Sequence, residues 1–153
     1  MTTKEKNRKK RYPDTATFHW HNANPKGKIT GDCTFRAIST ALEQSWEQTV
    51  MEMAELSCST GVAINDKTGI ENYLKSKGWV KHKQPRKDDN TKYTGTEFCK
   101  EMLRYDSEID TGSDMHHIIA MIGGHHIVAI MSGQVWDIWD CTRKCIGNYW
   151  TKG

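Results

Sequence analysis

The sequence predicts an α+β domain, because helical periodicity fills roughly its first hundred residues and strand-like patterning fills its last forty. Four segments before residue 104 place apolar side chains at helical spacing, and each opens on a residue suited to capping a helix. From residue 117 onwards, short apolar runs are separated by the turns Gly123-Gly124 and Ser132-Gly133. We therefore expect N-terminal helices packed on a C-terminal antiparallel sheet.

The totals favour one globular domain with reduced thiols. The chain has 153 residues, of which 36% are hydrophobic and 27% charged, enough to bury a core without disulfides. Its five cysteines are an odd number and widely scattered, which is typical of a reducing compartment. Since the sequence shows neither a signal peptide nor a membrane-spanning run, we expect a cytoplasmic protein with no membrane partner and no cofactor.

The first 13 residues are expected to form a disordered basic tail, with residues 14–153 as the single domain. This segment lacks apolar periodicity and sets one acid, Glu5, against six basic residues: Lys4, Lys6, Arg8, Lys9, Lys10 and Arg11. Such an arm can contact nucleic acid or an acidic partner. The chain's six Trp are not interleaved with basic residues, however, so nucleic acid is not the expected partner.

The first predicted helix begins at a cysteine. Residues 17–20 suit a short strand, and the turn-rich residues 21–28 lead the chain to Gly31-Asp32-Cys33. Asp32 can serve as N-cap, and an apolar stripe follows at Phe35, Ile38, Ala41 and Leu42. A thiol in a first helical turn faces unpaired N–H groups and the positive end of the helix dipole, which favour the thiolate. The alternative is that Cys33 is a small buried apolar residue.

The three remaining helices carry their own start signals. The capping boxes lie at residues 45–48, 68–71 and 94–97. The second helix should end by Thr60-Gly61, and the third at Gly78, where a strand at Trp79-Val80 begins. The polar residues 81–92 are expected to form a loop.

The last third predicts three antiparallel strands, at residues 117–122, 126–131 and 134–140, and an edge strand at 146–150. If the second hairpin turns through three residues, Met131 pairs with Val135, and His126 then lies opposite Asp140 on one sheet face. A two-residue turn would instead set His125 opposite Asp140. A His–carboxylate pair of this kind is what a thiol nucleophile requires, although a structural pair would look the same.

This order of parts resembles the papain-like cysteine peptidase fold. Gly31-Asp32-Cys33 resembles the nucleophile motif of the cell-wall (NlpC-type) and bacteriocin-processing branches, the run 124–130 resembles their His strand, and Trp139-Asp140-Cys141 resembles the third position. The whole pattern is similar to small uncharacterised proteins encoded by bacteriophages. The resemblance implies a papain-like domain over residues 14–153.

The resemblance also implies roles: Cys33 as nucleophile, His126 as base and Asp140 as the residue that orients it. The implied activity is a thiol hydrolase or amide-bond transferase acting on a protein or peptide substrate, with a host component in the host cytoplasm as the target if the chain is phage-encoded. The papain pattern has an oxyanion-donating Gln where this chain has Gly27. Asn22 and Asn24 are the substitute candidates, and the alternative is a catalytically inactive papain-like binding protein.

A metal site is the alternative to this triad. Cys141 and Cys145 lie near His125 and His126 in sequence, but the spacing is typical of neither a zinc ribbon nor a zinc finger. No metal is therefore expected.

Overall fold

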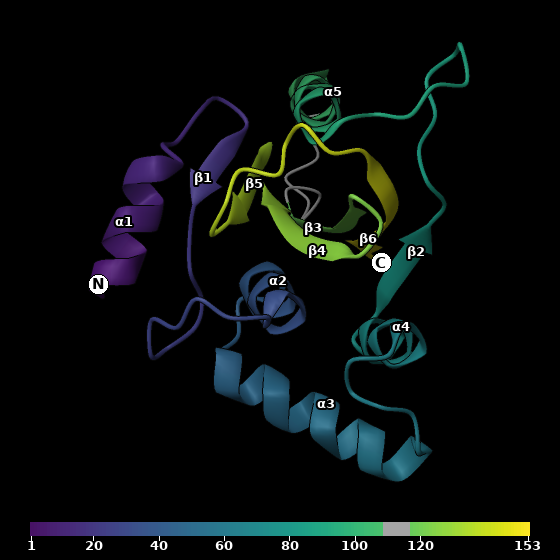
Figure 1. The fold of residues 1–153 in the computed structure, drawn as a ribbon. Coiled ribbons are helices and arrows are strands. Elements are labelled where there is room, and N and C mark those ends of the chain that lie inside the picture. Colours follow the sequence, from purple (N-terminus) through teal and green to yellow (C-terminus); the bar gives the residue numbers. More distant parts are fainter. Residues whose placement is uncertain (109–116) are drawn as a thin grey trace.

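The computed structural model describes residues 1–108 and 117–153, and these residues form five helices and one six-stranded mixed sheet (Figure 1). The helices are α1 (Thr3–Arg11), α2 (Cys33–Leu42), α3 (Trp46–Thr60), α4 (Lys67–Ser76) and α5 (Gly95–Glu108). The strands are β1 (Phe18–Trp20), β2 (Trp79–His82), β3 (His117–Ile122), β4 (His126–Met131), β5 (Gln134–Asp137) and β6 (Ile146–Lys152). The predicted α+β class is confirmed at this level.

The sheet has the strand order β1-β5-β4-β3-β6-β2, with β1 parallel to β5 and every other neighbouring pair antiparallel. Figure 1 shows α5 over one face and α2 on the opposite face, with α3 and α4 beyond it. Alternate residues of β4 supply the two cores: Val128 and Ile130 pack with Phe98 of α5, whereas Ile127 and Ala129 pack with the apolar stripe of α2. The sheet is therefore buried on both faces.

The predicted disordered tail contains helix α1, so that prediction is wrong for residues 3–11. Thr2 caps the helix by accepting a hydrogen bond from the Glu5 backbone N–H, and the basic residues of the last turn favour the negative end of its dipole. The helix also docks on the domain, because the Thr2 hydroxyl donates to the carbonyl of Gly27 at 3.3 Å. Gly27 has φ +66°, and a Cβ there would lie 2.1 Å from a Glu5 carboxylate oxygen. Only glycine permits this approach.

The second hairpin turns through two residues, not three. Met131 pairs with Gln134, and the turn residues Ser132 and Gly133 both have positive φ, as in the type I′ turns that match strand twist. The predicted pairing of Met131 with Val135 is therefore wrong, and the two-residue alternative is right. Strand β5 consequently ends at Asp137, which leaves Asp140 beyond the sheet ladder.

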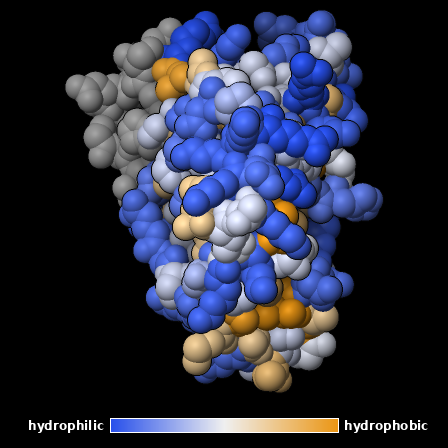
Figure 2. Space-filling model, turned by 60° about the vertical axis from the view of Figure 1, so that its left-hand side comes forward, coloured by the Kyte–Doolittle hydropathy of each residue, from blue (hydrophilic) through white to orange (hydrophobic). Residues whose placement is uncertain are grey.

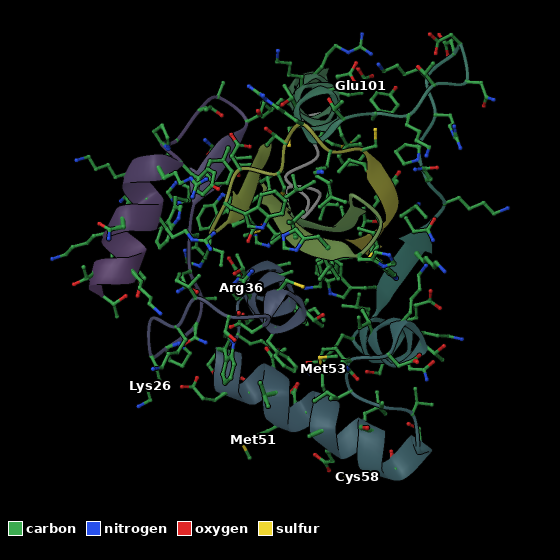
Figure 3. All side chains as sticks on the ribbon, viewed as in Figure 1. Lys26, Arg36, Met51, Met53, Cys58 and Glu101 are labelled. Atoms are coloured by element: carbon green, nitrogen blue, oxygen red, sulfur yellow. The ribbon has the colours of Figure 1, made fainter. Side chains whose placement is uncertain are left out.

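The outer surface is mostly polar. Figure 2 brings the α1 side forward and shows a largely hydrophilic face, with apolar surface gathered toward the end of the molecule that α3 forms. On α3, Met51 is 71% exposed and points away from the sheet, whereas Met53 points inward and is buried (Figure 3). Within residues 1–108 and 117–153, none of the helices is both long enough and apolar enough to cross a bilayer.

Candidate active site

Cys33 is the first residue of α2, as predicted. Asp32 occupies the N-cap position, but its side chain forms no capping hydrogen bond, and the helical ladder starts with the Arg36 N–H donating to the Asp32 carbonyl at 3.0 Å. The Asp32 carboxylate therefore leaves the N–H groups of the first turn to other partners. These groups and the helix dipole favour a negative charge on the adjacent thiol.

The Asp32 carboxylate is instead a buried hub. One oxygen accepts hydrogen bonds from the side chains of Asn24 and Trp46, each at 3.0 Å. The other oxygen forms an ion pair with Arg36, one helical turn along α2. The hub thereby ties the loop before Cys33 to α2 and α3, which fixes the start of α2.

Arg36 carries this network to the sheet. Its side chain lies between α2 and the edge of the sheet that β1 and β5 form (Figure 3), and it is only 6% exposed. One guanidinium nitrogen, Nη2, donates to Oδ1 of Asp137 at 3.2 Å, while Nη1 donates to the Thr30 carbonyl at 3.1 Å. A planar, permanently charged guanidinium suits such a bridge between two buried carboxylates.

Asp137 is the carboxylate that contacts the predicted base. His126 Nε2 and Asp137 Oδ2 lie 2.5 Å apart, and the Asp137 side chain is 3% exposed. Its other oxygen also accepts from the Ile138 N–H at 2.8 Å. Hydrogen bonds to both oxygens hold the carboxylate in one orientation, which in turn fixes the imidazole.

The prediction that Asp140 orients His126 is wrong. Asp140 lies beyond β5, and its Oδ1 accepts hydrogen bonds from the Thr142 N–H at 3.0 Å and the Thr142 hydroxyl at 2.6 Å. This local turn is a common use of Asp. The two-residue hairpin turn explains the difference, because it brings Asp137 rather than Asp140 to the face that His126 shares.

Cys33 and His126 are brought together, as predicted. Burial raises the pKa of the Cys33 thiol, but its hydrogen bond with His126, the charge of that ring and the Ile127 N–H together lower the pKa below its usual value. Burial likewise lowers the pKa of His126, but hydrogen bonds with Asp137, Cys141 and Cys33 outweigh it and raise the pKa to about 11. Both directions favour a thiolate–imidazolium pair.

Two further side chains enclose the imidazole. The Trp139 ring lies 5.2 Å from the His126 ring, centroid to centroid. The Cys141 sulfur lies 3.8 Å from Oδ2 of Asp137 and is 1% exposed. Because burial raises the pKa of Cys141, it remains a neutral thiol. Of the two thiols beside His126, Cys33 and Cys141, only Cys33 is thus suited to nucleophilic attack.

The same cluster offers metal ligands. The donor atoms of His126, Asp137 and Cys141 lie within 4.8 Å of one another, the one such group in the described part of the chain. However, the Arg36 guanidinium binds the same carboxylate, and the imidazole is held protonated. This positive charge opposes a cation, so the cluster is better suited to hold a proton than a metal ion.

The two predicted oxyanion donors build the loop before α2. Asn24 donates to Asp32 and accepts from the N–H groups of Lys26 and Lys28. Asn22 donates to the Lys28 carbonyl at 3.1 Å and accepts from the Asn24 N–H. With both amides engaged, the backbone N–H groups at the start of α2 are the better placed donors to a developing oxyanion.

Sequence reasoning missed Arg36, Asp137 and Cys141 as parts of the site. One signal in the sequence indicated Arg36: Asp32 and Arg36 are spaced i, i+4 on a helix, which suits an ion pair.

No family model, curated protein or solved structure matches this chain. The geometry of the site therefore carries the functional argument.

Proposed function

We propose that this protein is a thiol hydrolase or amide-bond transferase with Cys33 as nucleophile, His126 as general acid and base, and Asp137 as the residue that orients and stabilises the imidazolium. One observation carries the proposal: a helix-start thiol is hydrogen-bonded to a histidine whose Nε2 lies 2.5 Å from a buried carboxylate. Nucleophile, base and orienting group are the three parts that covalent thiol catalysis requires.

The reaction proceeds in two halves. The Cys33 thiolate attacks the substrate carbonyl, forming a carbon–sulfur bond and an oxyanion that the α2 N–H groups stabilise. Because Nε2 of His126 is engaged by Asp137, Nδ1 delivers the proton to the leaving amine as the carbon–nitrogen bond breaks. Water or a second amine then attacks the thioester and gives its proton to His126. The carbon–sulfur bond breaks, and the thiolate is regenerated.

The charges around the site support this cycle. Asp137 stabilises the imidazolium form of His126, and Arg36 neutralises part of the negative charge that Asp137 and Asp32 bring into the protein. Burying a carboxylate is costly unless its charge is paired. Arg36 thus reduces the cost of burying Asp137 beside His126.

The substrate class and origin follow only from the resemblance to papain-like cysteine peptidases and phage proteins. On that basis, we propose a protein or peptide amide of a host component as the substrate. The order of the parts supports this: a nucleophile helix, then a sheet with the histidine at the start of one strand and the aspartate at the end of the next.

A catalytically silent binding protein is the second candidate. It is favoured by the engagement of both Asn22 and Asn24 in loop hydrogen bonds and by the glycine where papain-like enzymes have an oxyanion-donating glutamine. In that case the cluster would be a structural network, and substitution of Cys33 would leave binding intact.

The two candidates are separated with p-nitrophenyl acetate, an activated ester that needs no specific recognition. The proposed enzyme should release a burst of about one nitrophenolate per chain, and peptide mass mapping should find the acetyl group on Cys33. Cys33→Ala should abolish the burst, while Cys58→Ala, at an exposed thiol, should keep it. Acetylation of Cys33 no faster than that of exposed Cys58 would eliminate the hydrolase and leave the binding protein.

A further inference from the structure

A depression of about 340 Å³ lies at the end of the sheet where β3 joins β4. Its walls include Met121, the turn glycine Gly124, Gly147 at the start of β6, and Cys145, which is exposed. Lys67 of α4 and Lys92 of the loop before α5 also line it. None of the residues described above as the catalytic cluster belongs to this set.

The strand pair β3–β4 links the depression to the surroundings of Cys33. Met121 pairs directly with Ile127 across β3 and β4, so their side chains share a face and their Cβ atoms lie about 5 Å apart. The N–H of Ile127 is also a hydrogen-bond donor to the Cys33 sulfur. Cys33 and Met121 accordingly pack against the same core cluster. Met121 thus connects Ile127, which neighbours the sulfur, with the depression whose wall it forms.

Glycines keep this space open. A Cβ at Gly147 would lie 3.2 Å from the Cβ of Met121, so any larger side chain there would project over that wall. Gly124 has φ +90°, a conformation that residues with a side chain rarely adopt, and nothing lies within 4 Å of where its Cβ would be. The space beside Met121 is thus free of side chains from positions 124 and 147.

The electrostatics of the depression are one-sided. Lys67 and Lys92 are cationic, and none of the described residues that line the depression is acidic. Neither lysine forms an ion pair within the residues that the structure describes. The neighbouring carboxylate of Asp66 is engaged in capping α4 through the Thr68 N–H at 2.8 Å. Two uncompensated ammonium groups beside a small polar cavity favour an anionic ligand.

We propose that this depression is the subsite for the acyl side of the substrate, and that it selects a residue bearing a carboxylate, such as glutamyl or aspartyl, next to the carbonyl that Cys33 attacks. This inference rests on the proposed function of Cys33. Lys67 and Lys92 attract the carboxylate, Met121 supports its methylene groups, and the glycines admit the backbone.

Two alkylating probes of equal size test the subsite: N-iodoacetyl-L-glutamate and its neutral amide analogue, N-iodoacetyl-L-glutamine. Mass mapping follows their rates at two cysteines, Cys33 at the nucleophile and Cys145 in the wall. The glutamate probe should react roughly three- to tenfold faster at both sites at low ionic strength, and this preference should shrink in 1 M salt. Lys67→Gln combined with Lys92→Gln should reduce the ratio to about one.

A matched variant controls for overall charge. Lys9→Gln with Lys10→Gln removes the same charge from the exposed side of α1 and should leave the ratio unchanged. Equal rates for the two probes at both cysteines, or a preference that persists in the Lys67 and Lys92 double variant, would overturn the subsite. Plain iodoacetamide reports separately on the proposed function: a Cys33 that reacts slowly with it refutes the activated thiol, while Cys145 still reports on the subsite.

Discussion

Nε2 of His126 lies 2.5 Å from Oδ2 of Asp137, whose side chain is only 3% exposed. The second oxygen of Asp137 is shared between Arg36 and the Ile138 N–H. The base is therefore positioned by a carboxylate that is itself held from two directions. Asp32 pairs with Arg36, and Arg36 in turn pairs with Asp137. Through His126 these contacts reach the thiol of Cys33, the residue after Asp32, so the charged groups of the site form a closed ring of contacts.

Asp137→Asn should slow the alkylation of Cys33 by limiting iodoacetamide at neutral pH by at least roughly tenfold. The hydrogen bond that His126 donates to Asp137 raises the pKa of His126, so its loss lowers the stability of the imidazolium and with it the thiolate population. Mass-mapped labelling gives the rate at Cys33 relative to the exposed thiols.

Asp140→Asn is the matched control, because Asp140 accepts hydrogen bonds from Thr142 in a local turn and, among the described residues, forms no hydrogen bond or ion pair with His126. It should leave the labelling rate within about twofold. A larger effect from Asp140→Asn than from Asp137→Asn, in folded variants, would restore the assignment made from sequence.

The pH dependence of Cys33 labelling should show an activated thiol. Burial raises the pKa of Cys33, but the hydrogen bond with His126 and its charge lower it overall, so the labelling rate should reach its plateau at a lower pH than that of an ordinary thiol. Cys141 should stay unreactive, since burial raises its pKa. His126→Gln should shift the Cys33 profile to higher pH. A profile for Cys33 that matches exposed Cys58 in the wild type would contradict the ion pair.

The pKa of His126 also predicts how stability depends on pH. Its folded pKa is raised to about 11 from 6.5 by Asp137 and the two thiols, against the opposing effect of burial. Its contribution is therefore fully present below about pH 6.5 and is lost as pH rises toward 11. Urea unfolding under reducing conditions should show this decline between pH 7 and pH 10, and His126→Gln should remove it. An unchanged slope in the variant would exclude His126 as its source.

The sequence predicted that the Cys33 thiol and the His126 imidazole come together, but it did not predict which carboxylate contacts the imidazole. Cys33 and His126 are fixed by local patterns, a helix start and a strand that follows a glycine turn. The identity of the carboxylate depends on whether the turn at Ser132-Gly133 has two or three residues. The length of this turn depends on a tertiary contact. A Cβ at Gly133 would lie 2.2 Å from a side-chain atom of Leu103, so the turn packs closely against α5, which lies 30 residues earlier in the sequence.

The contact between Arg36 and Asp137 could not be predicted from the sequence for a related reason. The pairing of Arg36 with Asp32 follows from helical spacing, but its contact with Asp137 joins residues 101 positions apart. Such a contact arises only when α2 packs on the sheet. Sequence periodicity predicts which face of α2 is apolar, and it does not predict that a buried cation crosses to β5.

Arg36→Lys should separate the structural role of this cation from its effect on the base. Lysine keeps the charge but cannot present the guanidinium fork that reaches Asp32, Thr30 and Asp137 together. We expect a folded but destabilised variant with a lower Tm and slower Cys33 labelling. Arg36→Gln removes the cation that two buried carboxylates share, which leaves Asp137 only His126 as a charged partner and Asp32 only neutral donors. It should lose about 3–5 kcal/mol of unfolding free energy. A Tm equal to the wild type in both variants would show that the bridge is not formed in solution.

Helix α1 can be tested by a double-mutant cycle with Gly27. Deleting residues 1–11 should lower the Tm by several degrees, because Glu5 is 8% exposed and Thr2 bonds to the Gly27 carbonyl. Gly27→Ala should destabilise the full chain through two effects, the strain at φ +66° and the 2.1 Å approach to Glu5, but the truncated chain through the strain alone. The two substitutions should therefore be non-additive in urea unfolding. Additive free energies, or a truncation that leaves the Tm unchanged, would show that the arm is free of the domain.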